Sequence, residues 1–543
     1  MQKRIIVSQV VREERTRTHT DRKAVYVKKE RRKTMKKLLT ILLAALMLLS
    51  VVACSRTTVE EAAAPATEPH EVRTDINLVN QEVLVSLDIM QTNKTFTRSV
   101  LVQVYEGLTV DNEDGTWDYL LADNISVSDD SLVYTVKLKQ GVIFHNGDEM
   151  KANDVAFSLN RAISMPFLAA YCGSIDHAEV VDDYTVTIYM KAPYAPMMTD
   201  LSYLPIVNEK LVTEAGDEKM ATEIVPCATG PYMLAENDET HVKLVAHDKY
   251  HRGAPQIKTV NFKIIADSST QLIAFEAGEI DLLNVPTANW ASVSADDRWN
   301  TEIIAANHYS MIELNLYGKY TSNILIRKAI AHAVDPEGVN AMGYDGLAVV
   351  CNRIADPAFV FGAPEEGTIF EYDPEKAKQY LADAGYPDGL DIGEITVAGG
   401  GYYEKMAIAI QGYLETVGIH GEIVTYDSAT VGNKARGNDY EILVSGHPLT
   451  SDYNFLREKW HSASNSATHN DVNDPYIDEM FDKGAAELNP EKRKEIYAEL
   501  DKYLSEYCLY PTMFHKTMCY AYDKNLTFSA VPSNYYVYNL KWN

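Results

Sequence analysis

The chain has 543 residues, a hydrophobic fraction of 46% and a formal net charge of −27. Its first 53 residues hold 14 of the 50 basic and 4 of the 77 acidic side chains, so the remaining sequence carries a formal charge of −37. A charge of that sign repels nucleic acid and anionic lipid, which excludes a nucleic-acid partner. Roughly 490 residues exceed the usual size of one hydrophobic core, so we expect two or three lobes.

The first element in chain order is an export signal. Residues 35–37 (Met-Lys-Lys) form a short positive segment, and an apolar run of 16 residues, 38–53, follows and ends at Cys54. This order is typical of a secretory signal, and the run is shorter than the ~20 residues that a spanning helix needs. Residues 51–54 (Val-Val-Ala-Cys) resemble a lipobox, where bacterial signal peptides are cut and the cysteine is acylated. We therefore expect lipidation at Cys54. An uncleaved anchor helix is the alternative, and both interpretations place the rest of the chain outside the cytoplasm.

The segments on either side of the signal have compositions that do not predict a fold. Residues 1–34 are strongly basic, and we interpret Met35 as the true start of translation. A nucleic-acid-binding arm is the alternative, but it fits poorly ahead of an export signal. Residues 54–75 begin at the expected lipid-bearing cysteine and continue as an alanine-, proline- and glutamate-containing stretch, which predicts a flexible tether.

Strands and helices then alternate along the chain. Residues 132–138 alternate apolar and polar side chains, as in a half-buried strand, whereas residues 154–162 repeat apolar side chains at helical spacing. The same patterns predict strands at 242–245 and 260–264 and helices at 269–277, 326–334, 374–384 and 490–506. The mixture predicts an α/β protein.

Five cysteines follow Cys54, at positions 172, 227, 351, 508 and 519. They include no C-x-x-C pair, so a zinc knuckle or a thioredoxin-like site is unsupported. Outside the cell one disulfide is allowed, and Cys508 and Cys519 are the pair nearest in sequence. Buried free thiols are the alternative.

Four blocks, in order, resemble one known family. They are residues 121–155, with Gly141-Val-Ile-Phe-His-Asn-Gly-Asp148 at the centre, Thr229-Gly230-Pro231-Tyr232, residues 326–335 and residues 372–387. On these motifs the chain, from about Ile76 to Trp542, resembles the extracellular solute-binding proteins of family 5. This is the oligopeptide-, dipeptide- and nickel-binding group that serves ABC importers.

Most of these motifs have a structural interpretation. Residues 229–232 predict a tight turn that enters a strand, since glycine tolerates unusual dihedrals and proline fixes one. Asp335 is expected to cap or end a helix. Lys151 stands where the family usually has a threonine that caps the following helix, so we expect a cost to local stability.

The resemblance implies a periplasmic-binding-protein-like type II clamp with three lobes and a hinge between lobes I and III. Lobe I would comprise residues 76–112, 205–307 and 515–543, lobe II residues 113–204 and lobe III residues 308–514. A ligand that touches both sides stabilises the closed form, which the importer recognises. The chain has no G-x-x-x-x-G-K-[ST] loop, so partner permease and ATPase subunits would supply the transport step. The resemblance further implies a monomer without cofactors, held at the membrane only by its lipid.

The resemblance also assigns ligand-binding positions. By position they fall on Asn93, Lys94, Thr95, Tyr309, Gly446 and His447. Peptide-binding members carry an aspartate beyond the glycine that pairs with the ligand's amino group, and Asp452 is the candidate here. Capping of the segment 453–460 is its alternative role. His447 replaces the usual tryptophan, which weakens the analogy with conventional peptide ligands.

A di- or oligopeptide is the leading ligand, and other classes stay open. A nickel chelate would use His447, and 34 tyrosines would suit an oligosaccharide that stacks on rings. His447, His461 and His469 invite a metal interpretation, although isolated surface histidines are the simpler one. A lipid-anchored hydrolase is a distant alternative, because the chain lacks G-x-S-x-G and H-E-x-x-H, so we expect neither catalytic residues nor a metal site.

Overall fold

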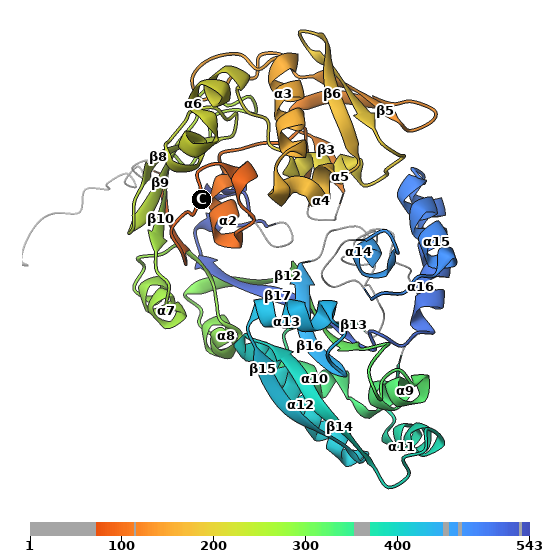
Figure 1. The fold of residues 1–543 in the computed structure, drawn as a ribbon. Coiled ribbons are helices and arrows are strands. Elements are labelled where there is room, and N and C mark those ends of the chain that lie inside the picture. The colour runs from red at the N-terminus through yellow and green to blue at the C-terminus, as the bar shows by residue number, and fades with distance from the viewer. Residues whose placement is uncertain (1–71, 113–115, 352–369, 449–455, 465–469, 531–534) are drawn as a thin grey trace, which may run out of the picture. The chain divides into compact units, whose positions relative to one another are not determined.

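A four-stranded sheet opens the folded part of the chain (Figure 1). Its order is β1 (Asp75–Asn80), β10 (Thr259–Ile264), β9 (His241–Ala246) and β8 (Tyr232–Asn237), with β1 parallel to β10 and the other pairs antiparallel. Alternate side chains on β1, β9 and β10 are buried, which is the pattern that predicted two of these strands. The predicted strands at 242–245 and 260–264 are thus confirmed as β9 and β10.

The computed structural model describes residues 72–112, 116–351, 370–448, 456–464, 470–530 and 535–543. The expected start, signal, lipidation at Cys54 and most of the tether lie outside these residues, as do Asp452 and His469. Residues 72–543 form one unit. Within the described ranges no helix is long and apolar enough to cross a membrane.

A second sheet is antiparallel throughout. Its order is β4 (Ala122–Val127), β5 (Val133–Leu138), β7 (Thr185–Met190) and β6 (Ile175–Asp182). Helix α3 (Ala152–Ile163) lies against β6, where the Asn160 side chain donates to and accepts from the backbone of Ala178, both at 2.9 Å. Smaller elements surround this sheet: η1 (Ile89–Gln91), α2 (Thr95–Leu101), β2 (Thr109–Asp111), β3 (Trp117–Tyr119), η2 (Pro166–Leu168), α4 (Ala169–Cys172), α5 (Met197–Tyr203) and α6 (Glu209–Thr222).

The third sheet is built on two long antiparallel strands, β12 (Trp299–Leu314) and β17 (Met513–Asp523). Its order is β11 (Leu282–Asn284), β17, β12, β16 (Ile442–Pro448), β14 (Leu390–Ala398) and β15 (Ile419–Tyr426), while β13 (Val349–Cys351) also pairs with β17. Ile304 on β12 packs against the core of the first two sheets, whereas Ile312 and Leu314 belong to the core of the third. The same strand therefore connects separate cores.

Helices flank the third sheet and complete the chain (Figure 1). They are α7 (Ser268–Glu276), α8 (Thr287–Ser294), α9 (Ile324–Ala333), α10 (Pro336–Gly343), α11 (Pro374–Asp383), α12 (Gly401–Thr416), α13 (Ser428–Arg436), α14 (Arg457–Trp460), α15 (Pro475–Ala486) and α16 (Pro490–Ser505), followed by β18 (Leu526–Thr527), η4 (Val537–Asn539) and β19 (Lys541–Trp542).

Local signals for helix ends are confirmed. The Asp335 side chain caps α10 and accepts from the backbone N–H of Glu337 at 3.2 Å. Gly385, just beyond α11, has a φ of +100°, a left-handed conformation that favours glycine. At α3, Lys151 supplies no hydroxyl, but the Asp154 carboxylate accepts from the Lys151 backbone N–H at 2.9 Å. Half of a capping box thus persists at this end.

The Thr229–Tyr232 motif forms the predicted turn, because β8 begins at Tyr232. Its contacts are tertiary as well as local: Thr229 Oγ1 donates to Glu106 Oε2 at 2.9 Å, and the Tyr250 hydroxyl donates to Glu106 Oε1 at 2.6 Å. Burial alone would raise the pKa of Glu106, but hydrogen bonds led by the one to His251 outweigh it and lower that pKa. The buried carboxylate therefore ties the turn to residues 250–251.

Of the two alternatives for the cysteines, the structure shows the free thiols and not the disulfide between Cys508 and Cys519. Cys508 and Cys519 are both buried free thiols, as are Cys172 and Cys227. Burial raises the pKa of Cys508 to about 12, so this thiol stays protonated and unreactive.

Gly230→Ala tests the turn. An added Cβ would lie 2.3 Å from the Val104 carbonyl oxygen, so backbone must shift. We expect a loss of about 1–3 kcal/mol in the free energy of unfolding, measured by urea denaturation. Gly412→Ala, on exposed helical surface with nothing within 4 Å of the new Cβ, is the matched control. It should be neutral or stabilising by up to ~1 kcal/mol. Equal midpoints for both variants would contradict the tight approach at Gly230.

Candidate ligand-binding site

Three of the residues predicted to bind ligand meet on neighbouring strands. Tyr309 on β12 lies directly opposite His447 on β16, and Gly446 lies opposite Ser310. The Tyr309 and His447 ring centroids are 6.0 Å apart. On its other edge Tyr309 faces His515 of β17. Antiparallel pairing thus gathers segments that are far apart in sequence.

The two faces of this sheet carry different sets of side chains, because successive residues of a strand point to opposite faces. One face, toward α10 and α12, carries His308, Ser310, Gly446, Phe514 and Lys516. The other face, toward α14 and α16, carries Tyr309, Glu313, His447 and His515.

A buried charge network holds His447 in place. Lys459 of α14 has its Nζ 3.1 Å from His447 Nε2 and 3.5 Å from Glu313 Oε2, and both charged side chains are less than 5% exposed. The Tyr440 hydroxyl donates to Glu313 Oε1 at 2.8 Å. Burial, and then the Lys459 charge, hold the pKa of His447 well below its ordinary value. His447 is therefore a neutral imidazole whose Nε2 accepts a hydrogen bond from Lys459.

The interpretation of isolated surface histidines is wrong for two of the three. His447 belongs to the network above, and His461 is buried, with Nε2 3.0 Å from Arg457 Nη2 and 3.3 Å from Asp482 Oδ1. In the part of the chain that the structure describes, no group of three or more His, Cys, Asp or Glu side chains is arranged to hold a metal ion.

Gly446 marks a close approach on the opposite face. A Cβ there would meet the Tyr309 carbonyl oxygen and the Tyr403 hydroxyl, each at 2.4 Å, and His308 Cε1 at 2.9 Å. Glycine at this position therefore lets β12 and α12 come together. The ring of Tyr403 contacts that of Tyr402, with centroids 4.2 Å apart and planes tilted by 48°, and sequence reasoning missed both rings because they stand in an ordinary amphipathic helix.

The other predicted contacts lie elsewhere. Asn93, Lys94 and Thr95 are exposed at the start of α2, where Lys94 occupies the cap position without a capping side chain. They lie at the start of α2 and in the loop before it, not on the β12–β16 ladder.

Two buried acids were also missed by sequence reasoning. Burial raises the pKa of Asp200 to about 8 and that of Asp111 to about 6. Tyr194 donates to Asp200 at 2.9 Å and Ser202 donates to Asp111 at 3.0 Å. In a chain with 77 acidic residues, no local signal marks these two.

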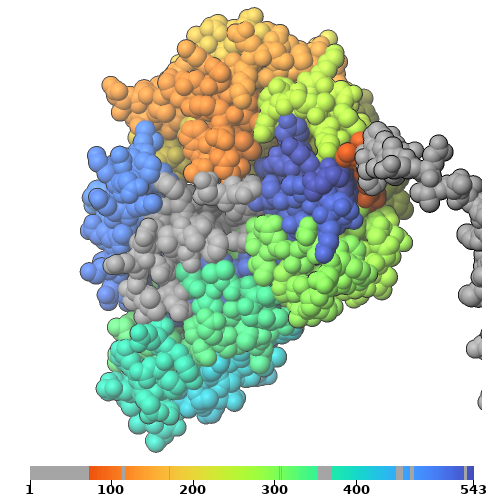
Figure 2. Space-filling view, turned by 180° about the vertical axis from the view of Figure 1, so that it is seen from behind, coloured from red at the N-terminus to blue at the C-terminus, as the bar shows by residue number. Residues whose placement is uncertain are grey.

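The segment before α5 also reaches α15. The backbone N–H of Ala195 donates to the Ala485 carbonyl at 2.6 Å, and the space-filling view shows the orange and blue surfaces in contact (Figure 2). The part of the chain that carries the second sheet thus touches the part that carries the third.

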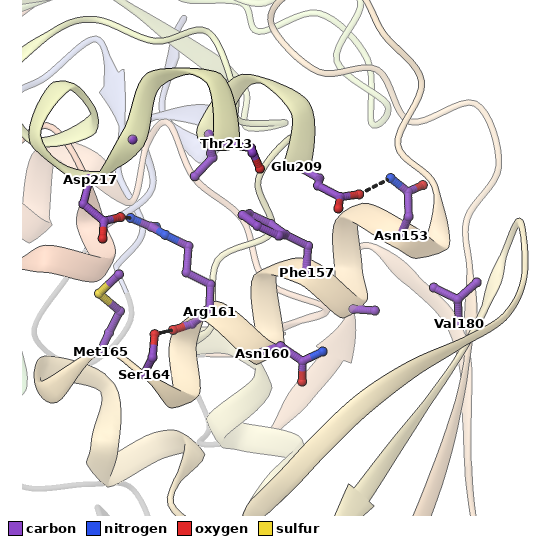
Figure 3. Close-up of a pocket in the computed structure, with 13 residues that line it drawn as sticks. Asn153, Phe157, Asn160, Arg161, Ser164, Met165, Val180, Glu209, Thr213 and Asp217 are labelled. Carbon is purple, nitrogen blue, oxygen red and sulfur yellow. Dashed lines mark hydrogen bonds and ion pairs between the residues drawn. The ribbon is translucent and has the colours of Figure 1, made fainter.

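A groove of about 710 Å³ lies between α3, β6 and α6 (Figure 3). Its polar side chains are paired within the protein: Arg161 with Asp217 at 2.7 Å, Asn153 with Glu209 at 2.8 Å, and Asn160 with backbone. Such a lining offers a solute little polar recognition, so the sheet site is the better candidate.

Two mixed sheets and one antiparallel four-stranded sheet, with a polar and aromatic site beside the long β12–β17 ladder, define an α/β fold of the multi-lobed periplasmic-binding-protein class. The family model described as "Bacterial extracellular solute-binding proteins, family 5 Middle" matches residues 116–467, and the chain belongs to this family. The fold class and family expected from the sequence are thereby confirmed.

Individual relatives are more distant. The glutathione-binding protein GsiB of Salmonella paratyphi A is 26% identical over 385 residues, which cover 69% of this chain and 74% of GsiB. The structure of HbpA2 from Haemophilus parasuis superposes with a TM-score of 0.77 at 22% identity, over 86% of this chain and all of HbpA2. That of Bacillus subtilis AppA, in complex with a nonapeptide, superposes with a TM-score of 0.70 at 21% identity, over 87% of this chain and all of AppA.

Lys459→Met tests the buried network. It leaves Glu313 buried without its cation, so we expect a loss of about 3–5 kcal/mol in the free energy of unfolding, measured by urea denaturation. The double variant Lys459→Met/Glu313→Gln removes both charges and should recover much of that loss. Lys405→Met, on the exposed surface of α12, is the control and should change the midpoint little. An unchanged midpoint for Lys459→Met would contradict the pairing.

Proposed function

We propose that this protein captures a di- or oligopeptide outside the cytoplasm and delivers it to an ABC importer. The observation that carries the proposal is the site on β12 and β16, where Tyr309, Gly446 and His447 lie together within a family 5 fold. Extended backbone together with polar and aromatic side chains suits a peptide, whose main chain gives affinity without demanding one side chain. The names of GsiB and of the AppA complex, which specify glutathione and a nonapeptide, support the same ligand class.

Capture would proceed by closure of lobes. Lobe I would comprise residues 76–112, 205–307 and 515–543, lobe II residues 113–204, and lobe III residues 308–514, with β12 and β17 crossing between lobes I and III. A ligand that contacts both sides stabilises only the closed form. The hydrogen bond from Ala195 to Ala485 supports a closed arrangement in which lobes II and III meet. Permease and ATPase subunits would then accept the monomeric, loaded protein.

The contacts with the ligand would come from several segments. Asn93, Lys94 and Thr95 are exposed and free to meet a solute, and Asp452 would pair with the amino group of a peptide. The nickel-chelate alternative is weaker, because Lys459 already donates to Nε2 of His447, which leaves only Nδ1 of that ring for a metal. An oligosaccharide would instead stack on rings such as Tyr402.

Peptide capture is tested by native mass spectrometry of the purified protein, followed by thermal shifts with dipeptides to pentapeptides, short oligosaccharides and Ni²⁺ with histidine. A ligand at a hundred times its dissociation constant should add about 2.7 kcal/mol of apparent stability. We expect peptides to do so and the other two classes not to. Nickel binding that His447→Ala abolishes would instead establish the chelate alternative, and stabilisation by sugars alone would establish the oligosaccharide one.

Membrane attachment is tested at Cys54. We propose that export exposes this cysteine for acylation and that the lipid is the only anchor. Cys54→Ala should move the protein from the membrane fraction to the soluble extracytoplasmic fraction, and labelled palmitate should be incorporated by the parent chain alone. Cys508→Ala, a buried thiol, is the control and should leave both readouts unchanged. Continued membrane association of Cys54→Ala would favour the uncleaved anchor helix.

A further inference from the structure

A half-buried lysine stands beside the site without an acidic partner. Lys516 lies on β17, on the same face of the sheet as Phe514, and none of the carboxylates in the described ranges lies within ion-pair distance of its Nζ. The Nζ atom of Lys516 lies over the ring of Tyr402, 5.3 Å from its centroid. A desolvated ammonium is normally paired with a carboxylate, because removal from water is costly otherwise. A cation–π contact offsets only part of that cost.

The pKa of Lys516 is shifted in the direction expected for a buried ammonium group without a carboxylate partner. Desolvation lowers the pKa of Lys516, with no neighbouring charge to oppose it. Lys459, the other buried lysine near this sheet, has Glu313 as its partner. The two lysines therefore differ in one respect: the protein supplies a counter-charge for one and not for the other.

His308 offers a second group without a partner at the same place. Its Nδ1 is buried and has no hydrogen-bond partner among the described residues, while its Nε2 lies 3.5 Å from the Tyr403 hydroxyl. Burial, together with the Lys516 charge, lowers the pKa of His308 to about 4. The imidazole is thus neutral, and the nitrogen that carries its proton can donate to an acceptor.

A β-bulge in the β12–β17 ladder brings Lys516 and His308 together. Pairing of β12 with β17 passes from Ala305 opposite Thr517 to Tyr309 opposite His515. Residues 306–308 therefore stand opposite Lys516 alone. Bulges of this kind redirect side chains and are frequent beside functional sites. Here the bulge lies immediately before Tyr309, within the proposed binding site.

We propose that Lys516 and His308 bind a carboxylate of the captured ligand, and that Tyr402 and Tyr403 contact the adjoining part of that ligand. The inference rests on the proposed function and deepens it, because it specifies a ligand with a free carboxylate. Such a group supplies the missing counter-charge to Lys516 and an acceptor for the His308 N–H. Charge-assisted hydrogen bonds of this type are the stronger ones in proteins. The surrounding rings exclude water and offer apolar faces to the ligand.

The test compares each peptide with its C-terminal amide, using alanyl-phenylalanine and its amide in isothermal titration calorimetry with the full chain. The unmodified protein should bind the free acid at least about tenfold more tightly than the amide. In Lys516→Met this ratio should fall to about twofold or less, whereas Lys516→Arg should keep most of it. Lys524→Met, just beyond β17 and exposed, makes the same change in net charge and should leave the ratio unchanged.

Two further measurements keep the inference separate from peptide binding. N-acetylphenylalanine and its amide carry no free amino group, so they probe the carboxylate contact alone. In the absence of ligand, Lys516→Met should raise the thermal midpoint, because it removes an unpaired buried charge, and Lys524→Met should not.

The outcomes are distinguishable. A protein that binds peptides without preferring the acid, or a Lys516→Met variant that keeps the preference, would overturn the carboxylate site and leave peptide capture standing. A protein that binds no peptide but binds N-acetylphenylalanine through Lys516 would overturn peptide capture and support the carboxylate site. Binding of neither probe would overturn both.

Discussion

The pairing of β12 with β17 is the constraint on which the rest of the protein depends. These two strands contribute to separate cores, and Tyr309, Gly446 and His447 of the candidate site are positioned from them. β16 adds to one edge of β12 and brings Gly446 and His447 next to Tyr309. The ladder is interrupted by the bulge between Ala305 and Tyr309, and strand pairing from Tyr309 onward keeps these side chains in register.

Desolvation gives the two faces of this ladder different roles. On the Tyr309 face, Lys459 is neutralised by Glu313, and the network is complete within the protein. On the opposite face, Lys516 and His308 lie among tyrosine rings with polar capacity left over. A completed network fixes structure, whereas an incomplete one is favourable only when something else supplies the missing group. The cost of desolvating charged and polar groups is therefore offset within the protein on the Tyr309 face. On the Lys516 face, the ligand would offset it.

Binding proteins of this kind exploit small differences between open and closed states. A ligand carboxylate would replace the hydration that Lys516 loses when the closed lobes exclude water. The binding free energy of that contact would therefore favour the closed form. The buried acids Asp111 and Asp200, near the contact between Ala195 and Ala485, place a second set of titratable groups close to that interface.

The sequence by itself determined the α/β class, the family and the ends of many helices. These features depend on local patterns: alternation in β9, the cap at Asp335 and the left-handed glycine after α11 can all be read within a few residues. The sequence also predicted Tyr309, Gly446 and His447 as ligand contacts, by their position in the family resemblance, and the structure brings these three together. Only the tertiary structure decided which charges are paired, because Glu313 and Lys459 are far apart in the chain. Nothing in the sequence near Lys516 indicates that this residue lacks a similar partner. The bulge opposite Lys516, the burial of His447 and the free thiols of Cys508 and Cys519 were likewise set by strand pairing and packing, which no local pattern encodes.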